Sequence, residues 1–468
     1  MPVEPQTLAP QTLAPQAAEP KIIVLDDDPT GSQTVHSCLL LLKWDVPTLV
    51  SALQDASPLV FILTNTRALP SETAAAVTQA VCHNLKLALP QAGIHDFLIV
   101  SRSDSTLRGH YPIETDVIAA ELGPFDAHFL VPAFFEGGRI TRDSIHYVVQ
   151  GGVPVPAHET EFAKDSVFGY HHSYLPDYVA EKTQGRIPAN AVQRLPLTRL
   201  RQGGGDRDLT LGHLTLENNA CVVVDGEQQS DLDALAQAVL AAARQGQRFL
   251  FRSAASLLTC PSAPPSPPQP RGCYRHGAYT RQGFPGAVIV GSHVQKTTQQ
   301  LQVLLTAPGT VAIEVEIAQL LAGDNRDAAT ARQQLLSQVL AQAHTAHAES
   351  KTPVIYTSRQ ELTFADTATR LDFGQQVSTL LMDILRGLPD TLGFLISKGG
   401  ITSNDTLSDG LALTRARLLG QIVPGCSVVI TADDHPQFPQ LPVVLFPGNV
   451  GDETALKLAY ERLSGVTA

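Results

Sequence analysis

Short apolar runs recur along the first half of the chain, and each one ends in polar residues. The first run begins at residue 22, and further runs lie at 39–42 and within 59–66, 96–106 and 128–133. Runs of this length without alternation are typical of strands buried on both faces of a parallel sheet. Segments with helical spacing separate them, one of which begins at Ser71. The pattern predicts an α/β fold with a largely parallel sheet flanked by helices.

The second half of the chain repeats this alternation. Apolar runs lie within 286–293, 353–358, 391–398 and 441–446, and residues 328–348 have the length and composition of a long helix. We therefore expect two α/β domains, each with its own largely parallel sheet, and an active site in the cleft between them. One continuous sheet would contradict this arrangement.

Proline content suggests where the domains meet. Residues 260–272 contain six prolines, which is typical of a semi-rigid linker. We predict an N-terminal domain over 21–259, a linker over 260–285 and a C-terminal domain over 286–468. Residues 1–20, in which QTLAP occurs twice, have too few large apolar groups to offset the entropy of ordering, so we predict a disordered tail.

Charge and composition limit the kinds of partner that the protein can be expected to bind. The formal charge of −12 argues against nucleic acid and anionic membranes, because phosphate contacts require a basic surface. It is compatible with a small anion held by a few arginines. The sequence has no run of 18 apolar residues, so we expect no membrane span. Its six cysteines are scattered without a CxxC pair, so we expect reduced thiols in a cytoplasmic protein.

The polar residues at the ends of the first strands share a chemistry of carboxylates, hydroxyls and arginines. They are Asp27, Asp28, Arg67, Arg102, Asp104, Ser105, Arg108 and Arg139. Ligands of parallel sheets bind beyond the carboxyl ends of strands, so this set predicts a site for a small hydroxylated anion. Arginine offers a planar fork for a carboxylate, while Asp and Ser bind hydroxyls. Helix caps and surface ion pairs are the alternative interpretation.

Three consecutive aspartates, at 26–28, stand at the centre of this set. Adjacent carboxylates repel one another and lose solvation when buried. Mg²⁺, a cationic group or a hydrogen-bonding substrate would offset that cost. A simple turn with a helix cap is the alternative, since Asp and Thr favour both.

Glycine-rich loops between a strand and a helix characterise the second half. They occur at Gly291, at Gly399–Gly400 and at Gly448–Gly451. Such loops let backbone N–H groups face a phosphate, so three of them favour a nucleotide site. Neither the P-loop pattern GxxxxGK(S/T) nor GxGxxG is present, so the site would be of another type.

These motifs together resemble the four-carbon sugar-acid kinase family over about residues 21–463. The resemblance is carried by VLDDDPTGS (24–32), NTRALPSETA (65–74), SRSDSTLRGH (101–110), PAFFEGGRIT (132–141), ETEFAKD (159–165), GSHVQKTTQQ (291–300), SKGGITSNDT (397–406) and PGNVGDE (447–453). It implies an N-terminal domain that binds a sugar acid and a C-terminal domain that binds ATP.

The family motifs also imply roles for single residues. On the substrate side they point to Asp27, Asp28, Arg67, Asp104, Ser105, Arg108 and Arg139. On the ATP side they point to Ser292, Gly399, Gly400, Thr402, Gly448 and Asn449. The chain departs from the usual motifs at Asp26, Pro29, Ser32, Phe446 and Pro447, which suggests a divergent branch.

We therefore expect a kinase that uses Mg·ATP to phosphorylate a hydroxyl of a small sugar acid, such as a tetronate or a 3-oxo-tetronate. Asp28 or Asp27 would act as the base, and Arg102 or Arg108 would stabilise negative charge. Arg67, Arg108 and Arg139 would clamp the substrate carboxylate. The sequence does not rank the two aspartates, identify a metal ligand or fix the oligomeric state, and a homo-oligomer is compatible with it.

Two other functions fit parts of the sequence. Asp26, Asp28 and Thr30 satisfy the DxDxT pattern of haloacid-dehalogenase-type phosphatases, with Asp433–Asp434 as an acidic pair. That reaction would proceed without ATP. A non-catalytic sensor of sugar acid and nucleotide would bind both ligands and form no ADP.

Overall fold

The structure is a computed structural model. It describes residues 19–465 except 33, 204–205, 260–279, 282, 322–327, 360–361, 363, 365 and 449. The predicted tail therefore lies outside the described residues apart from its last two, as does most of the predicted linker. Among the helices described, none has the length and apolar content needed to cross a membrane.

The N-terminal unit is built on eight parallel strands in the order β2-β3-β1-β4-β11-β5-β10-β9. Their bounds are β1 Lys21–Asp26, β2 Leu39–Leu41, β3 Leu59–Leu63, β4 Phe97–Arg102, β5 Ala127–Val131, β9 Gln193–Leu195, β10 Ala220–Val224 and β11 Phe249–Ser253. The apolar runs that predict strands are β1, β2, β3, β4 and β5, so the expected parallel sheet is confirmed.

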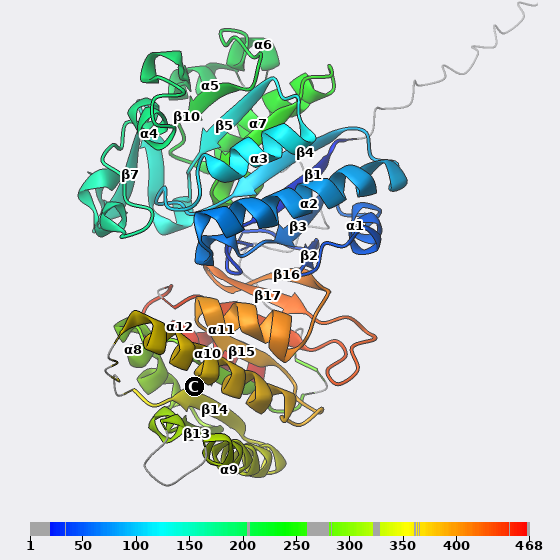
Figure 1. The fold of residues 1–468 in the computed structure, drawn as a ribbon, viewed down its shortest axis with the longest axis vertical. Helices are drawn as coiled ribbons and strands as arrows, with labels where there is room; N and C mark the ends of the chain where they lie inside the picture. Colours follow the sequence, from blue (N-terminus) through cyan, green and yellow to red (C-terminus); the bar gives the residue numbers. More distant parts are fainter. Residues whose placement is uncertain are drawn as a thin grey trace, which may run out of the picture.

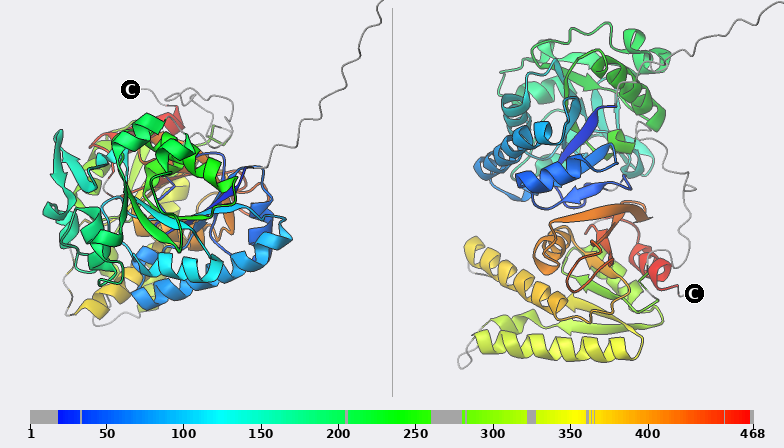
Figure 2. Two further views of the ribbon diagram at one scale, coloured as in Figure 1. Left: turned by 90° about the horizontal axis from the view of Figure 1, so that it is seen from above. Right: turned by 90° about the vertical axis from the view of Figure 1, so that its right-hand side faces the viewer.

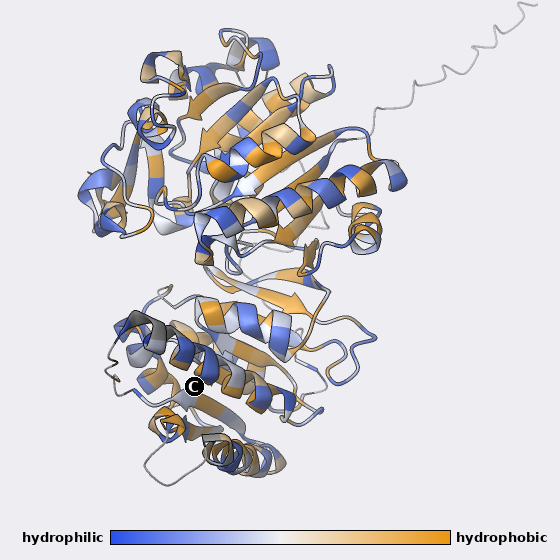
Figure 3. Cartoon of the chain, in the orientation of Figure 1, coloured by the Kyte–Doolittle hydropathy of each residue, from blue (hydrophilic) through white to orange (hydrophobic). Residues whose placement is uncertain are grey.

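Helices cover both faces of this sheet, because successive strand residues point to opposite sides. Ile23 and Leu25 of β1 belong to the core under α1 (Val46–Leu53), α2 (Ser71–Gln91) and α3 (Ile113–Leu122). Val24 belongs to the core on the other face, where α7 (Gln229–Ala243) packs. Figure 1 shows α2 and α3 crossing the near face of the upper unit, and Figure 3 shows that its strands are mostly apolar.

The C-terminal unit has five parallel strands, in the order β13-β14-β12-β15-β18, followed by two antiparallel ones, β17 and β16. The strands are β12 Ala287–Val290, β13 Thr310–Val315, β14 Thr352–Thr357, β15 Leu395–Lys398, β16 Arg415–Val423, β17 Cys426–Ile430 and β18 Pro442–Phe446. The helices are α8 Gln295–Leu304, α9 Ala328–Ala348, α10 Thr367–Arg386, α11 Gly400–Asp405 and α12 Ala455–Ser464. The predicted second α/β unit is thus present.

The strands of the two units belong to one continuous sheet, so the expectation of a separate sheet in each unit is corrected. Strand β16 pairs antiparallel with β2 through Arg415↔Leu41, Ala416↔Leu40 and Arg417↔Leu39, giving a single sheet of 15 strands. Both Figure 1 and the right-hand view of Figure 2 place β16 and β17 between the upper and lower units. The physical reason is that β2 is an apolar strand whose second edge would otherwise be bare, and β16 covers it.

A second, smaller sheet projects from the N-terminal unit. Its three antiparallel strands are β6 Arg139–Arg142, β7 Ile145–Gln150 and β8 Val153–Pro156. His146 of β7 is fully buried and lies 2.7 Å from the carbonyl oxygen of Ser105. The small sheet is therefore attached to the loop that follows β4.

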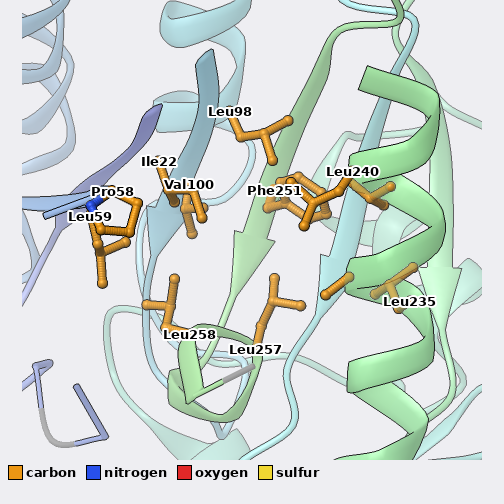
Figure 4. Close-up of a pocket in the computed structure, with 12 residues that line it drawn as sticks. Ile22, Pro58, Leu59, Leu98, Val100, Leu235, Leu240, Phe251, Leu257 and Leu258 are labelled. Carbon is orange, nitrogen blue, oxygen red and sulfur yellow. The ribbon is translucent and has the colours of Figure 1, made fainter. Parts of the chain in front are cut away.

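An apolar hollow lies over the main sheet beside α7 (Figure 4). It is lined by Ile22, Pro58, Leu59, Leu98, Val100, Leu235, Ala236, Val239, Leu240, Phe251, Leu257 and Leu258. Several of these residues stand at the beginnings of their strands, whereas the predicted site residues follow the ends. The lining offers no polar side chain to a sugar acid, so this hollow is not the predicted substrate site.

Candidate active site

Arg67 binds two aspartates of the loop after β1. Its Nη2 lies 2.5 Å from Asp27 Oδ1, and its Nη1 lies 3.0 Å from Asp28 Oδ2. Strands β1 and β3 are parallel neighbours, so their ends bring Asp27, Asp28 and the turn that contains Arg67 (η1, Thr66–Ala68) to the same edge of the sheet. The cationic group that could offset the clustered carboxylates is therefore supplied by the protein itself.

The two aspartates differ in accessibility. The Asp27 side chain is only 2% exposed, and its Oδ2 accepts a hydrogen bond of 2.6 Å from Ser103 Oγ. The Asp28 side chain is 24% exposed, with its Oδ1 bonded to the backbone N–H and hydroxyl of Thr30. Burial alone would raise the pKa of Asp28, but Arg67 and the Thr30 hydrogen bonds together hold that pKa below its usual value. Asp28 is thus the charged group that an arriving substrate can reach.

The loop after β4 adds a second layer of paired charges. Asp104 Oδ2 lies 2.8 Å from Arg108 Nε, and Asp104 Oδ1 lies 4.0 Å from Arg67 Nη1. Burial would raise the pKa of Asp104, yet the two arginines lower it far below its ordinary value. The predicted residues Asp27, Asp28, Arg67, Asp104 and Arg108 therefore form one contiguous cluster.

Arg108 and Arg139 meet at an aromatic ring. Their guanidinium carbons lie 5.2 and 5.7 Å from the centre of the Phe162 ring. Phe162 and Asp165, which lies 3.8 Å from Arg108, belong to the ETEFAKD motif at 159–165. Arg139 donates to the Gly137 carbonyl, while its Nε is buried without a hydrogen-bond partner in the described part of the chain. The structure therefore places Arg139 beside the cluster, and none of the described carboxylates forms an ion pair with it.

Asp26 is enclosed behind the other two aspartates. It is 1% exposed, and a Cβ atom at Gly31 would lie only 2.0 Å from its Oδ1, so only glycine fits there. Arg102 Nη1 approaches Asp26 Oδ1 at 3.4 Å. Burial raises the pKa of Asp26 to about 7, with Asp27 and Asp28 adding to the effect and Arg102 opposing it. An enclosed carboxyl is a poor nucleophile, which argues against the phosphatase alternative.

Arg252 lies beside the carboxylate cluster and was not among the residues predicted from the strand ends. It lies at 2.5 Å from Glu114 Oε2 in a fully buried ion pair and donates to Ser103 Oγ at 2.7 Å. Arg252 and Ser253 line a small hollow, together with Ser103, Asp104, Leu107, Arg108, Leu130, Pro132 and Tyr178. Ser253 Oγ is buried there without a hydrogen-bond partner among the described residues. The signal in the sequence was an arginine within the apolar run at 248–253.

The predicted nucleotide residues converge at the ends of β12, β15 and β18. A Cβ atom at Gly291 would lie 2.3 Å from Thr402 Oγ1, one at Gly399 would lie 3.1 Å from Ser292 Cβ, and one at Gly448 would lie 3.1 Å from Ser292 Oγ. Gly400 begins α11 in open space. Asn449 lies outside the described residues. Because the three loops pack closely together, their backbone groups are the groups that a ligand could contact there.

Lys398, the last residue of β15, was also missed. Its Nζ donates to the carbonyl oxygens of Pro447 and Gly448, the latter at 3.1 Å. The available signal was a lysine that stands between the strand residues at 395–397 and the two glycines at 399–400.

A protein-only metal centre is not evident. Within the described ranges, no three His, Cys, Asp or Glu side chains gather closely enough to hold a metal ion. The carboxylates of Asp27 and Asp28 are instead paired with Arg67.

Comparisons with known proteins place this geometry in context. A model described as a sugar-binding N-terminal domain matches residues 22–260, and one described as a nucleotide-binding C-terminal domain matches residues 287–456. A D-erythronate kinase of Heliobacterium modesticaldum is 27% identical over 313 residues, which cover 64% of this chain and 64% of that protein. A D-threonate kinase of Bordetella bronchiseptica is 27% identical over 188 residues, which cover 38% of this chain and 44% of that protein. The chain thus spans less than two thirds of the length of these curated relatives.

Solved structures share the fold. A Salmonella typhimurium LT2 protein, provisionally described as a tRNA synthase, superposes with a TM-score of 0.68 at 19% identity over 95% of this chain and 98% of that one. A Haemophilus influenzae protein superposes with a TM-score of 0.62 at 17% identity over 93% and 98% of the two chains. At such identities the likeness concerns the fold alone.

Proposed function

The chain belongs to the four-carbon acid sugar kinase family, and from this premise we propose that it transfers the γ-phosphoryl group of ATP to a hydroxyl of a small sugar acid. The observation that carries the proposal is a pair of sites with different chemistry. One combines carboxylates and arginines around Asp28 and Arg108, and the other packs glycines and hydroxyls around Ser292. The two relatives named as kinases of erythronate and threonate support a four-carbon acid.

The path between the two sites supports a shared reaction centre. Ser32, in the loop after β1, lies with its Oγ 3.4 Å from Ser427 Oγ of β17. Ser427 pairs with Leu445 of β18, and Gly448 follows three residues later. Gly448 lies about 10 Å along the chain beyond Leu445, and Leu445 lies about 5 Å from Ser427. One hydrogen bond and one strand pairing therefore connect the aspartate loop to the strand that leads into the glycine loop, which supports their taking part in one reaction.

The proposed chemistry uses few groups. The substrate hydroxyl oxygen attacks the γ-phosphorus, the bond from that phosphorus to the β-phosphate oxygen breaks, and ADP leaves. Asp28 orients the hydroxyl and accepts its proton, with Asp27 held behind it by Arg67 and Ser103. Arg108 binds the substrate carboxylate, and Arg102 or Arg108 stabilises charge on the transferring group. Positioning and charge neutralisation carry most of the catalysis in such reactions.

Magnesium fits this site as a companion of the nucleotide. Mg²⁺ generally binds through phosphates, waters and one or two carboxylates, and Asp28 is the partly exposed carboxylate here. When bound, the ion would neutralise phosphate charge. Asp28 would hold a water of its coordination shell.

An ADP-release assay over a panel of four- to six-carbon sugar acids tests the proposal. We expect turnover with at least one four-carbon acid, dependent on ATP. Binding of both ligands without ADP formation would instead support a sensor, and hydrolysis of a generic phosphate ester without ATP would support a phosphatase.

A further inference from the structure

Lys398 is a buried cation among glycine loops. It stands at the end of β15, is fully buried and pairs in register with Phe446 of β18, whose ring centre lies 4.3 Å from Nζ. None of the described residues supplies a carboxylate within ion-pair distance of it. A buried ammonium group is costly unless its hydrogen bonds are satisfied. What satisfies this one is the backbone of the turn after β18.

Two successive carbonyl groups of that turn accept from Lys398. They belong to Pro447 and Gly448, and the Gly448 oxygen also accepts a hydrogen bond of 2.9 Å from Thr297 Oγ1. Thr297 is fully buried in α8 and lies 3.1 Å from Ser292 Oγ. Lys398 of β15 and Thr297 of α8 therefore both bind the Pro447–Gly448 turn, and Ser292 of the loop after β12 is bonded to Thr297.

This arrangement determines which way a backbone donor points. In a trans peptide unit the C=O and the following N–H lie in one plane and point in opposite directions. Because the Pro447 carbonyl is directed at Lys398, the N–H of Gly448 is directed away from it. Backbone N–H groups of glycine loops that face outward are the donors that bind phosphate oxygens.

We infer that Lys398 is a positioning residue for the nucleotide, which holds the Pro447–Gly448 turn so that its N–H faces a phosphate oxygen. This inference rests on the proposed nucleotide site. Lys398 contributes through the turn and through its positive charge behind it, and has no direct contact with the ligand.

Ionisation of Lys398 should follow nucleotide binding. Burial lowers the pKa of Lys398 to about 7; the neighbouring titratable groups are Cys426 on β17 and Lys296 on α8. A bound phosphate favours the protonated lysine, so the pKa rises on binding. The affinity gained from this coupling is complete below about pH 7 and declines as the pH rises above it.

The test is calorimetric binding of Mg·ADP and of the sugar acid to Lys398→Met. Methionine keeps an unbranched apolar stem and removes the charge and both hydrogen bonds. We expect ADP affinity to fall about tenfold, or about 1.4 kcal/mol, and sugar-acid affinity to stay unchanged. In turnover assays the KM for ATP should rise more than kcat falls. Lys351→Met, a change at an exposed lysine paired with Glu349, is the matched control and should leave both affinities unchanged.

Two results separate this inference from the proposed function. If the unaltered protein binds no ADP, the proposed function fails. If it binds ADP and Lys398→Met binds equally well, only the role of Lys398 is overturned.

Should Lys398→Met fail to fold, Thr297→Val removes the second donor to the Gly448 carbonyl. We expect a two- to fivefold loss of ADP affinity, together with weaker binding by the unaltered protein at pH 8 than at pH 6. Unchanged affinity in both measurements would overturn the inference.

Discussion

Arg67 binds Asp27 and Asp28 at once, yet the two carboxylates have different surroundings. Asp27 is almost wholly enclosed and bonded through both oxygens, whereas Asp28 keeps part of its surface exposed. Position in the sequence could not rank these neighbours, because adjacent residues in a turn point in unrelated directions. Burial ranks them: Asp27 maintains the cluster, and Asp28 is the group that can meet a hydroxyl.

Replacing each aspartate by asparagine should separate these two roles. Asp28→Asn should lower kcat by about 10²- to 10⁴-fold with ADP affinity retained, because it removes the orienting base. Asp27→Asn should also lower the free energy of unfolding by on the order of 3 kcal/mol, because it leaves Arg67 partly unpaired. Steady-state kinetics and urea denaturation measure the two effects. Asp433→Asn, at an exposed position, is the control; near-normal turnover in both site variants would contradict the assignment.

Arg108 and Arg139 are the arginines beside the cluster that could take a substrate carboxylate, because Arg67 is occupied by Asp27 and Asp28. Both lie against Phe162, and Arg108, whose Nε binds Asp104, remains 27% exposed. Arg108→Lys should raise the KM for the sugar acid at least tenfold, because an ammonium group cannot reproduce the planar fork. The KM for ATP should change little. Arg142→Lys, at an exposed ion pair with Glu227, controls for the substitution, and unchanged kinetics would remove Arg108 from the site.

Asp26 should give stability an unusual pH dependence. Its folded pKa is raised to about 7, chiefly by burial, whereas an unfolded aspartate titrates near 4. Between these values the folded state binds the extra proton, so this group's contribution to the free energy of unfolding falls as the pH rises from about 4 to about 7. Asp26→Asn should abolish that contribution. Urea denaturation at pH 5 and pH 7.5 compares the two proteins, and parallel pH profiles would refute the prediction.

At the scale of elements, local pattern predicted the strands well and their partners less well. Unbroken apolar runs became β1, β3, β4, β12, β14 and β18 because each is buried on both faces. The pairing of β16 with β2 joins residues more than 370 positions apart, and no local periodicity encodes such a contact. The small β6–β8 sheet was missed for another reason. Its strands are short and only partly buried, so their apolar pattern is weak.

The β16–β2 pairing should decide whether the two units unfold together. Ala416 is buried and pairs with Leu40, and a proline there cannot donate a ladder hydrogen bond. Ala416→Pro should split a single calorimetric unfolding transition into two, since each unit also has a core cluster of its own, one around Ile23 and one around Val288. Ala416→Ser keeps the N–H group and serves as the control. One unchanged transition in the proline variant would show that the pairing does not couple the units.

At the scale of the whole molecule, the two α/β units followed from the sequence, and their union in one sheet did not. The predicted division at 260–285 stays a prediction, because most of that range lies outside the described residues. Arg252, beside the carboxylate cluster, is a charged residue inside an apolar run, and Lys398, beside the glycine loops, is the last residue of its strand. Their environments arise only when strands distant in sequence come together, which explains why a strand-end analysis passed over them.

The shared sheet also bears on how this chain could be divided. A fragment without β16 would leave one edge of β2, whose residues are Leu39, Leu40 and Leu41, without a partner strand. An apolar edge strand is a template for association with other chains. A fragment that began with the C-terminal unit would carry the same hazard on β16. Each unit thus covers the strand edge that the other unit would expose on its own, and so protects that edge from aggregation.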